Sequence, residues 1–251
     1  MRIVVIGGHG FIGTRLVSIL RANGHDVIAA SRSYGVDAVT GEGVSEAVAG
    51  AQVVVDVAES PLIDDPAVHE FFVKESRNVL GAEKVARVRH HVALSLVGVD
   101  RVRDSPYFYA KAAQEVLIAG SSIPYTIVRS TQFFEFMERI IQLAADGDAI
   151  RVPPALIQPV APDDVAEVLA EIAVASPLNG TIELAGPERI CLNELARLIL
   201  SAHEDPRDII ADPGANFFGA RLDPQSLIPG ANPRIGPSTV RDWLRQFMTA
   251  D

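Results

Sequence analysis

Short apolar runs alternate with longer amphipathic segments along the first two-thirds of the chain. The short runs are rich in β-branched residues and lack polar alternation, which is typical of parallel strands covered on both faces. They predict strands at residues 2–7, 26–31, 36–40, 52–57, 91–96, 125–129 and 181–184. The longer segments place apolar residues three and four positions apart and predict helices at 11–23, 66–88, 107–119, 133–145 and 163–175. This order predicts an α/β fold, a doubly wound parallel sheet with helices on both faces.

The pattern changes near the C-terminus. Residues 206–237 hold six of the 16 prolines and four glycines, which predicts mostly loop. Ser238 is a candidate N-cap for a short amphipathic helix that carries Trp243, Leu244 and Phe247. We therefore expect a core over residues 1–150 and a smaller C-terminal lobe over 151–251, with the strand at 181–184 able to return to the main sheet.

Composition and charge narrow the class of protein. The 251 residues are 48% hydrophobic and contain no apolar run near the roughly 18 residues that a membrane span needs. Cys191 stands alone and has no partner for an internal disulfide, so a reduced, cytoplasmic setting is expected. The net charge of −10 argues against nucleic acid or an anionic membrane as a partner.

Glycines cluster directly after the first predicted strand. The run Gly7-Gly8-His9-Gly10-Phe11-Ile12-Gly13 satisfies both GxxGxxG and GxGxxG and opens the first predicted helix. Glycines at these positions permit a tight turn and let a pyrophosphate approach bare N–H groups at a helix N-terminus. The strand-turn-helix context predicts a dinucleotide site in a Rossmann-type fold, with His9 contributing its backbone amide, rather than a glycine-rich turn that serves packing alone.

The end of the second predicted strand distinguishes between the two dinucleotides. An NAD site usually carries Asp or Glu there for the ribose 2′-hydroxyl, whereas an arginine accommodates the 2′-phosphate of NADP. This chain has Ser31-Arg32-Ser33, and Asp26 lies at the other end of the strand. The sequence favours NADP(H) over NAD(H), the alternative being a solvated surface arginine.

Tyr107 and Lys111 are the main catalytic candidates. They lie four residues apart at the start of a predicted helix, so their side chains share one face. A nearby ammonium favours the ionised tyrosine, and bringing its pKa from about 10 to near 7 takes roughly 4 kcal/mol. We expect Lys111 to supply part of this stabilisation of the ionised Tyr107. Ser95, at the end of the fifth predicted strand, is a candidate to bind a substrate carbonyl, or else bonds to backbone.

Together these motifs resemble the short-chain dehydrogenase/reductase superfamily. More narrowly, the sequence resembles its atypical NmrA-like, NAD(P)H-binding branch in the segments GGHGFIG, SRS, RHHVALSLVGVD, SPYFYAKAAQE, PYTIVRSTQFFEF and APDDVAEVL. The resemblance covers nearly the whole chain and implies a catalytic trio of Ser95, Tyr107 and Lys111. The cofactor-binding residues that it implies are Gly7, Gly8, His9, Gly10, Phe11, Ile12, Gly13, Ser31, Arg32, Ser33, Val57, Ala58, Lys111, Ser130 and Gln132.

The resemblance also implies a substrate pocket lined by Phe133, Phe134 and Phe136. The chain departs from the superfamily pattern at two points. Phe72 stands where many members carry a catalytic asparagine, and Ser130-Thr131 replaces a proline-containing nicotinamide loop. The expected function is an NADPH-dependent reductase of a small carbonyl or quinone. The alternatives are an NADP(H)-binding redox sensor without turnover and a nucleotide-sugar epimerase.

The remaining candidate residues are explained by ordinary structural roles. Asp163 and Asp164 open a predicted helix, where carboxylates stabilise the N-terminal dipole. The six histidines form no HExxH, so no metal site is expected. Phe217 and Phe218 belong either to the core or to a pocket wall. The oligomeric state stays open.

Overall fold

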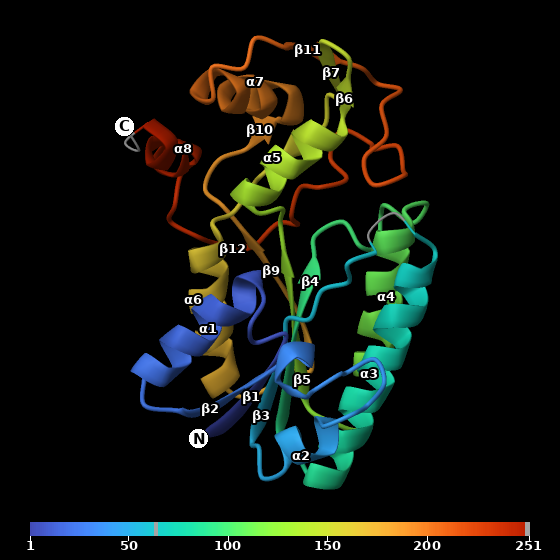
Figure 1. Cartoon of the computed structure of the whole chain (residues 1–251), viewed down its shortest axis with the longest axis vertical. Coiled ribbons are helices and arrows are strands. Elements are labelled where there is room, and N and C mark those ends of the chain that lie inside the picture. Colours follow the sequence, from blue (N-terminus) through green and yellow to red (C-terminus); the bar gives the residue numbers. More distant parts are fainter. Residues whose placement is uncertain (63–64, 249–251) are drawn as a thin grey trace.

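Seven parallel strands form the central sheet of the computed structural model, which describes residues 1–62 and 65–248. Their order is β12-β9-β5-β4-β3-β1-β2 (Figure 1). The strands are β1 (Arg2–Ile6), β2 (Asp26–Ala30), β3 (Val53–Asp56), β4 (His90–Leu96), β5 (Tyr125–Ser130), β9 (Gly180–Ala185) and β12 (Arg234–Ile235). This is the Rossmann-like α/β architecture that the sequence predicts.

Helices cover both faces of the sheet (Figure 1). One face carries α1 (Phe11–Ala22) and α6 (Pro162–Val174), and the other carries α2 (Val44–Val48), α3 (Ala67–Ala86) and α4 (Pro106–Ala119). Successive residues of a strand point to opposite faces, so Val5 packs in the core beside α1 while Val4 packs in the core beside α2. The unbroken apolar runs in the sequence follow from this double coverage.

A smaller lobe stands above the carboxyl ends of the strands (Figure 1). It contains α5 (Phe134–Leu143), β6 (Ala145–Asp146), β7 (Ala149–Val152), β8 (Leu156–Ile157), β10 (Ile190–Cys191), α7 (Leu192–Ala202), β11 (Asp208–Ala211) and α8 (Val240–Met248). Its hydrophobic core lies between α5, α7 and α8. The expected return of residues 181–184 to the main sheet is confirmed, because β9 pairs in parallel with β5.

The prediction of a strand at residues 36–40 is wrong. The carboxylate of Asp37 accepts hydrogen bonds from the backbone N–H groups of Val39 and Thr40, so these groups are not offered to a neighbouring strand. The amide of Asn78 on α3 donates to the carbonyls of Ala38 and Val39 and fixes the loop against α3. A short 3₁₀ turn (Arg32–Tyr34) precedes this loop.

The predicted N-cap of the last helix is also wrong by one residue. Thr239, not Ser238, exchanges hydrogen bonds with Asp242 at the start of α8. Ser238 instead donates its hydroxyl and its backbone N–H to the carboxylate of Asp164. Asp164 therefore ties the C-terminal segment to the start of α6, which is a tertiary role that the sequence pattern does not reveal.

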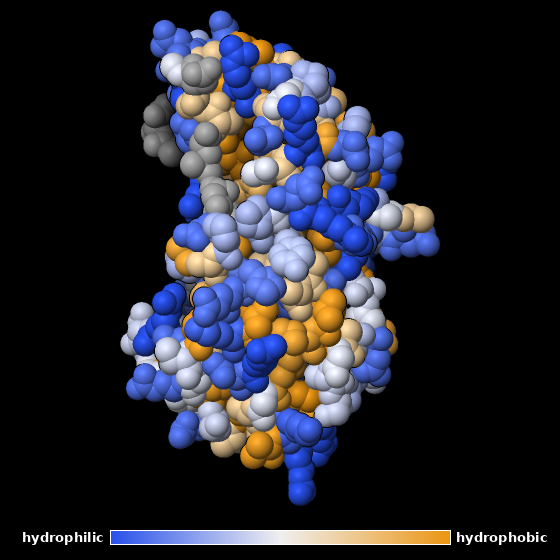
Figure 2. Space-filling view, turned by 90° about the vertical axis from the view of Figure 1, so that its right-hand side faces the viewer, coloured by the Kyte–Doolittle hydropathy of each residue, from blue (hydrophilic) through white to orange (hydrophobic). Residues whose placement is uncertain are grey.

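The α3 and α4 face is partly apolar. Figure 2 looks at this side of the molecule and shows hydrophobic residues gathered on its lower half, with mostly hydrophilic residues above. Val85 on α3 and Tyr109 and Val116 on α4 are among the exposed large hydrophobic residues. Within the described ranges, no helix has the length and apolar content that crossing a membrane requires.

Candidate cofactor and catalytic site

A cavity of about 680 Å³ lies between the carboxyl ends of the strands and the smaller lobe. It runs from the glycine turn and the end of β2, past the ends of β3, β4 and β5, to the side chains of α4 and α5. Ligands of doubly wound α/β proteins bind at this edge of the sheet, and the volume is in the usual range for small-molecule sites. The position and size fit a dinucleotide together with a small substrate.

The glycine turn is shaped by close backbone packing. Gly7 has a φ of 76°, a left-handed conformation that favours glycine. A Cβ on Gly13 would lie 2.1 Å from the carbonyl oxygen of Gly7, and a Cβ on Gly8 would lie 2.7 Å from the Cα of Ala29. Gly8 and Gly13 therefore bring α1 against β1 and β2, whereas Gly7 and Gly10 line the cavity.

The first turn of α1 is open toward the cavity. Its N-cap, Gly10, has no side-chain cap, and within the described residues no backbone hydrogen bond reaches the N–H groups of Phe11 or Ile12. Both residues line the cavity. Unsatisfied N–H groups at a helix N-terminus bind anions, so this turn fits the pyrophosphate of a dinucleotide.

Ser31, Arg32 and Ser33 line the far end of the cavity beside β2. Arg32 is exposed, and its side chain has no ion pair or hydrogen bond within the described part of the chain. Asp37 also lines this end, but its carboxylate is bonded to the loop backbone. A free guanidinium beside two hydroxyls suits a phosphate group.

The side chain of His9 has a structural role that the sequence did not predict. Its Nδ1 lies 2.9 Å from the hydroxyl of Ser31, and its ring stacks on Tyr34 with centroids 3.9 Å apart. These contacts join the glycine turn to the 3₁₀ turn after β2. The imidazole thus helps to fix the hydroxyl of Ser31 at the cavity wall.

Lys111 on α4 reaches the cavity through a buried polar network. Its Nζ donates to the carbonyl of Leu94 at 2.8 Å and to Oε1 of Gln114 at 2.5 Å. Gln114 in turn donates to the carboxylates of Asp56 and Glu75. Burial and the nearby Asp56 carboxylate raise the pKa of Glu75 well above its ordinary value. This network fixes the ammonium at the cavity edge.

Phe72 occupies the space beside Lys111, with its ring centroid 4.5 Å from Nζ. Phe72 is fully buried on α3, at the position where the superfamily pattern places an asparagine. The cation lies over an aromatic face, which is a favourable arrangement but offers no hydrogen-bonding group. Phe72 therefore cannot supply the hydrogen-bonding groups that an asparagine would have.

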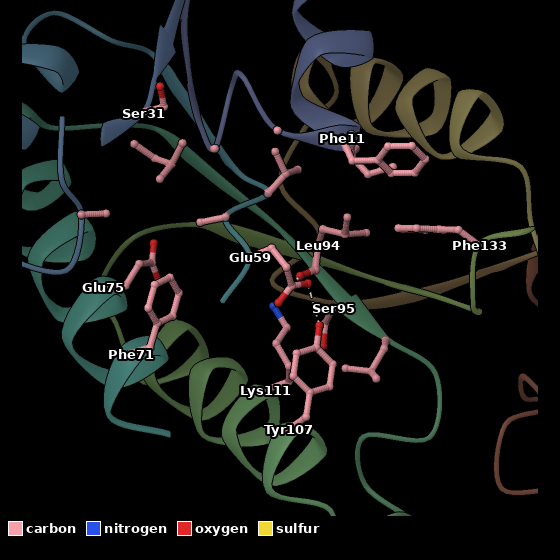
Figure 3. A pocket seen from close by; sticks show the side chains of 18 of the residues that line it. Phe11, Ser31, Glu59, Phe71, Glu75, Leu94, Ser95, Tyr107, Lys111 and Phe133 are labelled. Atoms are coloured by element: carbon pink, nitrogen blue, oxygen red, sulfur yellow. Dashed lines mark hydrogen bonds between the residues drawn. The ribbon is translucent and has the colours of Figure 1, made fainter. Parts of the chain in front are cut away.

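Tyr107 lies one helical turn before Lys111 but contacts a different residue. Its hydroxyl donates to Oε2 of Glu59 at 2.7 Å (Figure 3). Burial and the negative charge of Glu59 raise the pKa of Tyr107 well above its ordinary value. The expectation that Lys111 lowers this pKa is not met in this structure, because Glu59 lies against the phenol. Glu59 is a cavity residue that the sequence analysis missed.

Ser95 and Gln132 line the cavity, and each has a buried polar atom without a hydrogen-bond partner among the residues that the structure describes. Ser95 at the end of β4 is buried, and its Oγ has no hydrogen bond within the described residues. Oε1 of Gln132, just after β5, is likewise unpaired there. Buried polar atoms are usually satisfied, so unpaired ones at a cavity wall fit groups that await a ligand. Ser130, Val57 and Ala58 also line this part of the cavity.

Aromatic rings form the wall near Tyr107. Phe133 and Phe136 line the cavity as expected, but Phe134 is fully buried in the lobe core and stacks on Trp243 with centroids 5.3 Å apart. Phe134 points away because residues one position apart on a helix face different sides. The expectation that it lines the substrate pocket is therefore wrong.

The neighbouring residues Phe217 and Phe218 have different surroundings. Phe217 is buried in the core of the lobe, whereas Phe218 lines the cavity and lies 6.2 Å from Tyr107 and 5.6 Å from Phe136 between ring centroids. Phe218 has a φ of 49°, followed by Gly219 at 78°, in a tight turn. Non-glycine residues rarely adopt this conformation, and such strain is typical of functional sites.

Comparisons with known proteins show the family of the chain and proteins of similar fold. The model of the NAD(P)H-binding family matches residues 7–176, and the chain belongs to this family. A short-chain dehydrogenase/reductase superfamily protein of Agrobacterium tumefaciens with bound NAD is 18% identical, with a TM-score of 0.72 over 100% of this chain and 97% of that chain. The superfamily resemblance drawn from the sequence is thus confirmed in the fold.

Two other similar proteins have more specific descriptions. An NADPH-dependent quinone oxidoreductase of Escherichia coli is 17% identical, with a TM-score of 0.68 over 98% of this chain and 100% of that chain. The photosystem II assembly factor Ycf39 of Cyanophora paradoxa is 24% identical over 149 residues, which are 54% of this chain and 46% of that protein. The match therefore spans less than half the length of this curated relative.

Proposed function

We propose that this protein is an NADPH-dependent oxidoreductase that reduces a small, apolar carbonyl or quinone-like substrate. The observation that carries the proposal is one continuous cavity that joins an open helix N-terminus to the side chains of Tyr107, Lys111 and Ser95. The dinucleotide supplies hydride when bound, and the protein supplies binding, orientation and a proton. The proposal assigns the open turn of α1 to the pyrophosphate and Arg32 to the 2′-phosphate.

The residues near α4 would position the substrate oxygen and protonate it. Ser95 Oγ, which has no partner within the described residues, would donate a hydrogen bond to the carbonyl oxygen. Tyr107 would donate the proton that the reduced oxygen needs, and Lys111 would hold the ribose. The rings of Phe136 and Phe218 beside Tyr107 favour a flat, apolar substrate over a sugar.

A screen of NADPH oxidation against quinones, ketones and aldehydes tests this proposal. Wild type and Tyr107→Phe are compared after both are shown to bind NADPH. We expect wild type to consume NADPH with one class of compound and Tyr107→Phe to lose at least about 100-fold of that rate, the usual contribution of a positioned proton donor. Equal rates in the two proteins would contradict the role of Tyr107.

One observation favours a regulator that binds NADP(H) without turnover. In this structure the Tyr107 hydroxyl contacts Glu59 and not Lys111, so the phenol holds its proton firmly. The name of the relative Ycf39, an assembly factor, is consistent with such a role. Tight NADPH binding by a protein that oxidises none of the panel would support the regulator and count against the reductase.

A further inference from the structure

Glu59 is placed to exchange protons with the candidate proton donor. It follows β3 by three residues and extends into the cavity toward α4 (Figure 3). Its Oε2 accepts the hydrogen bond of the Tyr107 hydroxyl at 2.7 Å, across 48 positions of the chain. Glu59 is exposed to the cavity, so water can reach its carboxyl group. A carboxyl with one side on a phenol and the other on solvent can carry a proton between them.

The other groups near Tyr107 do not offer this path. Lys111 is held by a backbone carbonyl and by the amide of Gln114, and neither of these carries a titratable proton. Phe72 fills the space on the other side of Lys111. Ser95 has no hydrogen-bonded partner within the described residues from which to take a proton. Among the residues that the structure describes, Glu59 is the titratable group that hydrogen-bonds to the phenol.

The surroundings of Glu59 favour a carboxyl that keeps its proton longer than usual. Although Glu59 is exposed to the cavity, the surrounding walls remove part of the hydration of its carboxyl group and so raise its pKa. Lys111 and Tyr107 of α4 and the N–H of Ser60 lower this pKa, Asp56 of β3 raises it, and the net direction is upward. Glu75 of α3 lines the same part of the cavity, and the positive charge of Lys111 acts on its carboxyl group as well as on that of Glu59. An elevated pKa suits a group that must donate a proton near neutral pH.

We propose that Glu59 is a positioning and proton-relay residue that returns a proton to Tyr107 after each reduction, an inference that rests on the proposed function. As hydride from the reduced nicotinamide dinucleotide forms a C–H bond, the carbonyl π electrons move to oxygen, which takes the phenol proton of Tyr107. The phenolate then takes the carboxyl proton of Glu59. The Glu59 carboxylate takes a proton from water, so one hydride and one solvent proton reach the substrate per cycle.

Kinetics of Glu59→Gln provide the first test. Glutamine keeps the size and a hydrogen bond but carries no titratable proton. We expect kcat to fall about 100-fold or more, with the Kd for NADPH within about twofold of wild type. In wild type, kcat falls as the pH rises through the pKa of Glu59, because the proton to be delivered is lost. The Glu59→Gln variant does not show this fall of kcat with pH. In the Glu59→Ala variant, added formate restores part of the rate.

The matched control is Glu70→Gln. Glu70 is exposed on α3, pairs with Lys74 and does not line the cavity. Its substitution makes the same change from carboxyl to amide and leaves kcat and the pH profile as in wild type. Wild-type kcat and pH profile in Glu59→Gln, with Tyr107→Phe still inactive, would overturn the relay and leave the reductase standing. A raised Kd for NADPH with unchanged kcat would make Glu59 a cofactor contact and would also overturn the relay.

A second readout needs no cofactor and no turnover. The ionisation of Tyr107 in the free protein is followed by ultraviolet difference absorbance, with Tyr107→Phe subtracted to remove the other three tyrosines. Glu59 raises the pKa of Tyr107, so Glu59→Gln moves this ionisation to lower pH, while Glu70→Gln does not. An unmoved Tyr107 titration in Glu59→Gln would contradict the contact itself. Absence of turnover in wild type would overturn the relay and the reductase together.

Discussion

The two ends of the cavity are built in different ways. At the end beside β2, the pyrophosphate position is formed by backbone, with glycines where an added Cβ would clash and a helix N-terminus open to an anion. The end beside α4 is formed by side chains from β3, β4, α3 and α4 that meet through tertiary packing. The first end has its shape fixed by local sequence, whereas the second depends on partners that are far apart along the chain.

This difference explains what could be predicted from the sequence. The glycine turn and the strand-helix alternation are local patterns, so they predicted the fold and indicated where a dinucleotide site is to be proposed. Tyr107 and Lys111 share a helix face and were also recognisable. Glu59 lies in a loop with no motif and is 48 residues from its partner, so its contact with Tyr107 was not predictable. A carboxylate shortly after a central strand is the signal that could have suggested it.

Substitution of Gly13 is the strongest test of the backbone-built end. A Cβ there would lie 2.1 Å from the carbonyl oxygen of Gly7, so Gly13→Val must push α1 away from the turn. We expect the free energy of unfolding to fall by about 3 kcal/mol or more and NADPH binding to be lost. Urea denaturation and isothermal titration measure the two effects.

Gly81→Ala is the control for Gly13. Gly81 lies on the exposed side of α3, where an added Cβ meets nothing within 4 Å. Alanine in a helix is favoured over glycine, so this variant gains up to about 1 kcal/mol and binds NADPH as wild type does. If Gly13→Val were as stable as Gly81→Ala, the close packing of α1 would not be what fixes the turn.

Arg32→Ala tests the polar edge of the same end. Loss of a charge-assisted contact to the 2′-phosphate would raise the Kd for NADPH roughly 10- to 100-fold and leave the Kd for NADH unchanged. The effect weakens at high salt, because Arg32 is exposed. Arg241→Ala, at an exposed position on α8, is the control and changes neither Kd. Equal losses for both dinucleotides would contradict selection of NADP(H) by Arg32.

Phe218 and Phe217 give a smaller, paired effect at the side-chain end. Phe218→Ala removes a ring from the cavity wall, and we expect a roughly tenfold higher KM for an aromatic substrate with an unchanged Kd for NADPH. Phe217→Leu alters the lobe core and lowers the free energy of unfolding by about 1 kcal/mol while KM stays the same. Steady-state kinetics and thermal unfolding separate the two. A higher KM in Phe217→Leu alone would contradict the placement of Phe218 at the cavity wall and of Phe217 in the core of the lobe.

In the proposed function, cofactor binding and proton donation are carried out by separate ends of one cavity. The Kd for NADPH and the rate of NADPH oxidation, measured on the same samples of wild type, Arg32→Ala and Tyr107→Phe with a substrate found in the screen, test this directly. Tyr107→Phe should bind NADPH as wild type does and lose about 100-fold or more in kcat, whereas Arg32→Ala should lose affinity and keep kcat at saturating NADPH. A Tyr107→Phe protein that keeps its kcat, or that loses NADPH affinity in parallel with kcat, would contradict this division of roles between the two ends.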